Sequence, residues 1–107
     1  MKSSAVGIAP PGGLSPETLK KLGTVLRSNP AVEQIILFGS RAMHRHQHSS
    51  DIDLALKGSK LNFSKLLQLK SAIDDLILPY KVDLVLYETI QNKDLKEHID
   101  QVGIALW

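Results

Sequence analysis

Cysteine is absent from the 107-residue chain. Its absence excludes disulfide bonds, thiolate nucleophiles and cysteine-based zinc sites, so any metal ion would have to bind oxygen or histidine ligands. A chain without cysteine also suits a reducing compartment, and we expect a cytoplasmic protein. No apolar run approaches the ~18 residues that a membrane span needs, and residues 1–13 lack the long apolar centre of a secretory signal. We therefore expect no membrane association.

Neither sign of charge is in clear excess: the chain has 13 Lys and Arg and 11 Asp and Glu, for a formal net charge of +2. This balance gives no electrostatic argument for direct binding to nucleic acid, and we expect none. Hydrophobic residues make up 43% of the chain, as in folded globular domains. The length fits one domain, which we expect over residues 14–107 after a flexible tail at residues 1–13. So small a domain has little surface for two substrate pockets.

Helical periodicity predicts three main helices. The first begins at Ser15, which can cap free backbone N–H groups, and ends at Asn29-Pro30. The second covers residues 62–78, where apolar residues recur at the helical period, and Pro79 closes it. The third is a short amphipathic helix that Gly103 ends. We read residues 41–50 as one short helix followed by a polar, basic loop.

Strands alternate with these helices. Short runs rich in β-branched and apolar residues predict strands at residues 33–38, 52–56 and 81–87, with a short fourth strand at residues 104–106. We therefore predict an α/β (α+β) fold, in which a small mixed sheet of about four strands is covered by helices.

Three carboxylates interrupt the strands. Asp51 and Asp53 are two residues apart, so in a strand they project to the same face, while Asp83 lies inside a later apolar run. If the two strands are neighbours, three like charges meet and need a cation to neutralise them. Oxygen-only ligands suit Mg²⁺, and also Mn²⁺. The alternative is that these are ordinary solvent-facing positions, although Asp is depleted in strands.

The pair Gly39-Ser40 follows the first strand and opens the short helix. Such a turn offers free backbone N–H groups and a hydroxyl, and glycine allows a phosphate to approach closely. By itself the pair is also what a routine strand-to-helix turn would contain.

The combination resembles the DNA polymerase beta-like nucleotidyltransferase superfamily, and within it the minimal nucleotidyltransferases of MNT antitoxins. Its pattern is Gly39-Ser40, ten residues, then the Asp51-Ile52-Asp53 motif, then a later strand with Asp83. Arg41 and Ser50 also look like that group. The resemblance covers roughly residues 14–107.

The resemblance implies roles for the matching residues. Gly39 and Ser40 would bind the β- and γ-phosphates of ATP, with Arg41 and Ser50 beside them. Asp51, Asp53 and Asp83 would be both the catalytic residues and the ligands of Mg²⁺, and Asp83 would also accept the proton of the attacking hydroxyl.

The resemblance also implies an acceptor. Relatives that modify RNA, DNA or antibiotics generally carry extra helical domains, for which this chain has no room. The expectation is therefore AMP transfer from ATP to a tyrosine of a helical HEPN-domain toxin, with this chain as antitoxin. Two alternatives stay open: a non-catalytic module that neutralises a partner by binding it, and an antibiotic nucleotidyltransferase with a pocket between subunits. A homodimer is also open, and no residue identifies the preferred base.

The histidines give weaker signals. His44, His46 and His48 lie between the two motifs, where a solvated loop is the simpler interpretation. The alternative is a zinc site at His44 and His48, which a helix would place on one face. We expect His98 on the surface of the last helix.

Overall fold

The fold was described from a computed structural model, which describes residues 11–45 and 50–107. The helices and strands follow one another in the predicted order. Their bounds are η2 Pro11–Gly13, α1 Pro16–Leu26, β1 Gln34–Phe38, α2 Gly39–Ala42, β2 Ile52–Lys57, α3 Phe63–Asp74, β3 Val82–Leu86, η3 Tyr87–Thr89, α4 Lys93–Val102 and β4 Ile104–Ala105.

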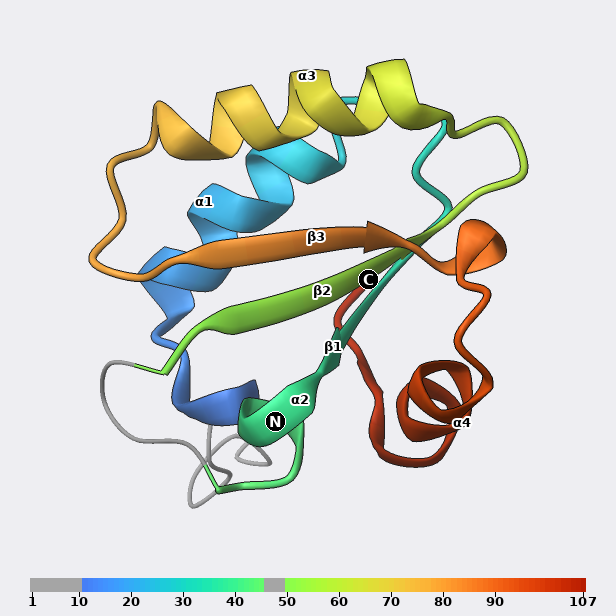
Figure 1. Cartoon of the computed structure of the whole chain (residues 1–107). Coiled ribbons are helices and arrows are strands. Elements are labelled where there is room, and N and C mark those ends of the chain that lie inside the picture. The colour runs from blue at the N-terminus through green and yellow to red at the C-terminus, as the bar shows by residue number, and fades with distance from the viewer. Residues whose placement is uncertain (1–10, 46–49) are drawn as a thin grey trace, which may run out of the picture.

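The sheet has four strands in the order β3-β2-β1-β4 (Figure 1). Strand β1 runs antiparallel to both β2 and β4, whereas β2 and β3 run parallel, so the predicted mixed sheet is confirmed. The parallel pair needs a crossover connection, which α3 supplies. Strands β2 and β3 are therefore neighbours, as the clustering of carboxylates requires.

The two faces of the sheet differ in their cover (Figure 1). Side chains alternate along β2, so Ile52, Leu54 and Leu56 enter the larger core under α1 and α3 and are fully buried. Asp53 and Ala55 point to the opposite face, where Ala55 packs in a smaller cluster with Ile99 of α4. This second face is apolar at its centre and carries carboxylates at one end.

The helix starts agree with the sequence, and α4 ends at Val102, before Gly103, as predicted, but the ends of α1 and α3 differ. The Ser15 side chain accepts a hydrogen bond from Thr18 N and caps α1. Helix α1 ends at Leu26, before the predicted stop at Asn29-Pro30, and α3 ends at Asp74 instead of Leu78. Within the described parts of the chain, no helix combines the length and apolarity needed to cross a membrane.

Part of the predicted tail belongs to the folded domain. Pro11–Gly13 form a short 3-10 helix, and Gly12 is buried. Its carbonyl accepts a hydrogen bond of 2.7 Å from Arg41 Nη1, which ties this segment to α2. Leu14 follows and is fully buried. The other residues of the predicted tail, 1–10, lie outside the described residues.

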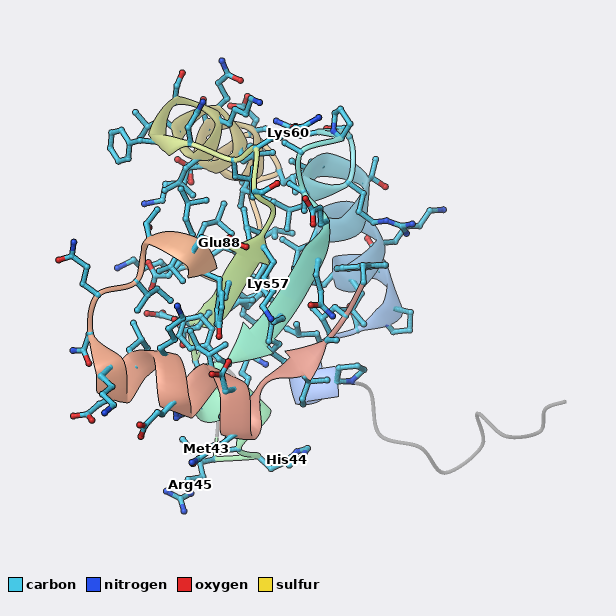
Figure 2. The ribbon with its side chains drawn as sticks, turned by 90° about the vertical axis from the view of Figure 1, so that its right-hand side faces the viewer. Met43, His44, Arg45, Lys57, Lys60 and Glu88 are labelled. Carbon is cyan, nitrogen blue, oxygen red and sulfur yellow. The ribbon has the colours of Figure 1, made fainter. Side chains whose placement is uncertain are left out.

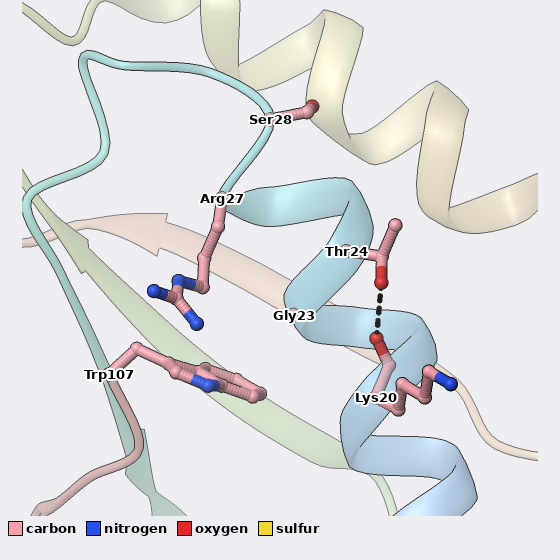
Figure 3. Close-up of a pocket in the computed structure, with 6 residues that line it drawn as sticks. All are labelled: Lys20, Gly23, Thr24, Arg27, Ser28 and Trp107. Carbon is pink, nitrogen blue, oxygen red and sulfur yellow. Dashed lines mark hydrogen bonds between the residues drawn. The ribbon is translucent and has the colours of Figure 1, made fainter.

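Trp107 closes the sheet against α1. Its backbone carbonyl accepts a hydrogen bond from Ile35 N at 2.9 Å, and its indole lies beside Gly23 (Figure 3). A Cβ at Gly23 would come within 2.6 Å of the ring, so glycine is needed for this contact. Lys20, Thr24, Arg27 and Ser28 line the rest of an open pocket of about 430 Å³ beside the indole.

Ile77 carries backbone strain at the end of α3. Its φ of 51° is left-handed, a conformation that costs β-branched residues about 1–2 kcal/mol, while its side chain is 88% exposed. We expect Ile77→Gly to raise the free energy of unfolding by about 0.5–1 kcal/mol, because glycine adopts this conformation without a steric penalty. Chemical denaturation measures the change. Ile77→Ala is the matched control, since it removes the same exposed side chain but keeps Cβ. Equal stability of the two variants would contradict this account.

Candidate active site

Two of the predicted carboxylates lie side by side in the sheet. Asp53 of β2 pairs in register with Asp83 of β3, and neighbouring strands are about 4.8 Å apart. Asp51 lies one residue before β2 begins and is exposed. The sheet thus brings Asp53 and Asp83 together from strands that α3 separates in the sequence.

Electrostatic repulsion links all three carboxylates. Burial raises the pKa of Asp53 above its ordinary value of 3.8, and the charges of Asp83 and Asp51 raise it further. Positive charge on His98, when its imidazole is protonated, and on Lys81 acts in the opposite direction and lowers the same pKa. A bound cation would reverse the balance, because it neutralises the repulsion that the carboxylates exert on one another.

The carboxylates do not form a closed metal cage as they stand. Among residues 11–45 and 50–107, no three or more Asp, Glu or His side chains meet in an arrangement that could hold a metal ion. Lys81 Nζ lies 3.9 Å from Asp83 Oδ1 and would compete with a metal for that oxygen.

The Gly39-Ser40 turn lies against the same carboxylates. Gly39 follows β1 directly and has a φ of 75°, which favours glycine. A Cβ at this position would overlap the carboxylate of Asp53, so the close approach of the two residues also requires glycine. Phe38, the residue before the turn, pairs in register with Asp53. Both predicted motifs therefore meet at one end of the sheet.

Arg41 and Ser50 form a structural link beside this site. The guanidinium group of Arg41 is 2% exposed and donates to Ser50 O from Nε at 3.1 Å and from Nη2 at 3.0 Å, as well as to Gly12 O. It also lies 4.9 Å from the centre of the Tyr80 ring. Arg41 thus holds together segments that surround the site. Its contact with the triphosphate, and that of Ser50, stay predictions.

His98 is a site residue that the sequence did not identify. It lies on α4, and its Nε2 accepts a hydrogen bond of 3.1 Å from Gly39 N. Its ring also meets Phe38 edge-on, at 6.1 Å between centroids. The side chain is half-buried, so the expectation of a plain surface residue was wrong. No local pattern around His98 could have revealed a contact with a turn so far away in the sequence.

The basic segment after α2 projects from the same end of the molecule. Figure 2 shows Met43, His44 and Arg45 together beyond α2, at the opposite end from Lys60. His44 and Arg45 are exposed, which agrees with a solvated loop. His46, and His48 as the possible zinc partner of His44, lie outside the described residues.

Comparison with known proteins gives this geometry a family. Residues 20–107 match the model of the polymerase beta nucleotidyltransferase domain. Two relatives from Methanocaldococcus jannaschii, which their names provisionally describe as protein adenylyltransferases, are 33% and 34% identical to the chain over 86 and 88 residues. Each alignment covers 79% of this chain and 87% of the relative.

Solved structures give the same result. A chain from a toxin-antitoxin complex crystallised with AMP-PNP superposes with a TM-score of 0.69 and 27% identity, over 83% of this chain and 72% of the other. A complex of a tri-AMPylated Shewanella oneidensis HEPN toxin with an MNT antitoxin gives 0.63 and 25%, over 83% and 68%. The predicted resemblance is confirmed: the chain belongs to the polymerase beta nucleotidyltransferase family of enzymes.

Proposed function

We propose that this chain is a Mg²⁺-dependent nucleotidyltransferase that transfers AMP from ATP to a tyrosine hydroxyl of a helical HEPN-domain toxin, and so acts as its antitoxin. The observation that carries the proposal is the meeting of the Gly39 turn with Asp53 and Asp83 at one end of the sheet. The acceptor is inferred from the neighbours, one of which is an MNT antitoxin with a tri-AMPylated HEPN toxin.

The carboxylates fit Mg²⁺ by their chemistry. Asp51, Asp53 and Asp83 offer only oxygen atoms as ligands, and a bound cation would offset the burial and the carboxylate repulsion that raise the pKa of Asp53. When bound there, Mg²⁺ would neutralise charge on the phosphate oxygens and on the leaving pyrophosphate. Mn²⁺ has the same ligand preference and is expected to replace it.

The residues of the chain then mainly position the reactants. The backbone N–H groups of the Gly39-Ser40 turn and the Ser40 hydroxyl bind the β- and γ-phosphates. The tyrosine oxygen attacks the α-phosphorus, and the bond from that phosphorus to the pyrophosphate oxygen breaks. Asp83 accepts the tyrosine proton, and the products are AMP-tyrosine and pyrophosphate. Lys81 adds a positive charge beside Asp83 where phosphate charge accumulates.

The packing of the described helices favours a protein acceptor. The described helices pack on the sheet as its cover, and none of them forms an additional acceptor-binding layer within residues 11–45 and 50–107. Asp51 is exposed, so the reactive end of the sheet is open to a second polypeptide. A partner that brings its own tyrosine would therefore complete the site without an acceptor pocket among the residues that the structure describes.

AMP transfer should depend on the paired aspartates. We expect Asp51→Asn/Asp53→Asn to lower transfer of label from α-labelled ATP to the co-purified HEPN partner by at least about 100-fold. The reason is that a bound metal stabilises the charge of the transition state by several kcal/mol, and each 1.36 kcal/mol corresponds to about a tenfold change in rate. The matched control is Asp74→Asn/Asp75→Asn, which makes the same charge change at exposed positions on the α3 side.

Two outcomes would contradict this proposal. Absence of label with the partner, Mg²⁺ and each of the four nucleotides would exclude the transfer reaction. If Asp51→Asn/Asp53→Asn protects cells from the toxin as well as the unmodified chain does, the antitoxin acts by binding and not by catalysis.

The pH dependence of stability should reveal the strained carboxylate. Because the pKa of Asp53 is higher in the folded chain than its ordinary 3.8, the folded state binds the proton more tightly, and ionisation of Asp53 costs stability as pH rises through the folded pKa. Without metal, Asp53→Asn should therefore be more stable than the unmodified chain at pH 7.

The same comparison should change with acid and with metal. The advantage of Asp53→Asn should disappear at a pH well below 3.8, where Asp53 is protonated in both states. Saturating Mg²⁺ should stabilise the unmodified chain and leave the variant nearly unchanged. Denaturation midpoints measure all three effects. Lower stability of Asp53→Asn at pH 7 without metal would contradict the inferred repulsion.

A further inference from the structure

The contact between His98 and Gly39 joins α4 to the phosphate-binding turn. His98 Nε2 accepts the Gly39 N–H at 3.1 Å, and the packing of its ring against Phe38 fixes the orientation of the imidazole. The next residue of α4, Ile99, is buried against the sheet. The helix is therefore anchored, and its histidine reaches the turn from a fixed position.

The hydrogen bond defines the state of the imidazole. Nε2 can accept only when it carries no proton, so the ring is neutral while the bond lasts and its proton is on Nδ1. The lowering of the Asp53 pKa by His98 applies to the doubly protonated ring, which cannot accept from Gly39. The neutral ring of His98 therefore accepts the Gly39 N–H, which a bound phosphate oxygen would also need.

We propose that His98 is a positioning residue that holds the Gly39 N–H in the nucleotide-free protein and is displaced from it by a phosphate group of the bound triphosphate. This inference rests on the proposed function, because it needs the turn to bind phosphate. Nucleotide binding then releases the α4 side chain from the turn. The turn binds nucleotide more weakly than it would without His98, since the ligand must replace an existing hydrogen bond.

Binding affinities of three variants test this displacement. The ligand is the ATP analogue with a methylene group between the α- and β-phosphates, with Mg²⁺, which binds without transfer and is measured by calorimetry. His98→Ala should lower Kd by about three- to tenfold, the range that one net hydrogen bond supplies. His98→Gln places a side-chain amide oxygen near the position of Nε2 and should keep the original Kd. Gln101→Ala, an exposed change on the same helix, is the matched control.

The outcomes separate the two proposals. If the unmodified chain does not bind the analogue, the proposed function fails. If it binds but His98→Ala binds equally well or more weakly, the displacement fails alone, because a merely structural histidine or a phosphate-binding histidine would give those results.

Nitrogen NMR of the unmodified protein tests the inference directly, and a variant is needed only to assign the signals. Before ligand is added, the His98 signals should show an unprotonated Nε2 and a protonated Nδ1, with the His98→Gln spectrum giving the assignment. On saturation with the analogue, the His98 nitrogen signals and the Gly39 amide signal should shift together. A saturated complex in which both keep their ligand-free positions would overturn the proposal.

Discussion

The register of β2 with its two neighbours is the constraint on which the rest of the structure depends. Asp53 pairs with Phe38 on one side and with Asp83 on the other. Because side chains alternate along β2, the same register that buries Ile52 and Leu54 under α1 and α3 turns Asp53 to the opposite face. A shift by one residue would bury the carboxylate and expose the core, so the large core fixes the position of the site.

A buried charge holds the surroundings of that site in place. Arg41 contacts Gly12, Ser50 and Tyr80, which come from three segments far apart in the chain. Burial of a guanidinium group is costly unless its donors are paired, and backbone carbonyls supply that pairing here. The segment before Asp51 is thereby fastened to the helix that follows Gly39. Arg41 contributes to the site by fixing where the two motifs lie relative to each other.

Local pattern predicted most of the fold, and tertiary contacts account for the differences. The strands followed from alternation and apolar runs, whereas the neighbouring positions of Asp53 and Asp83 were only a condition of the carboxylate cluster until the strand order met it. The end of α3 could not be predicted in this way, because Ile77 adopts a left-handed conformation that β-branched residues rarely adopt. The contact of His98 with Gly39 and the burial of Arg41 depend on how distant elements pack, which a single sequence does not encode locally. Chemistry-bearing residues inside strands were therefore easier to identify than those that support them.

The pairing of β4 with β1 has a consequence for the order of folding. Strand β1 can pair with β2 across the connection that follows it in the sequence. Its other edge pairs with residues near position 105, where Leu106 N donates to Ile35 O at 2.8 Å. Closing so long a loop carries a larger entropy cost and is slower. The one tryptophan of the chain, Trp107, takes part in this closure and packs on Gly23. Its fluorescence will therefore report the late closing of the sheet, separately from the formation of the β1–β2 pair.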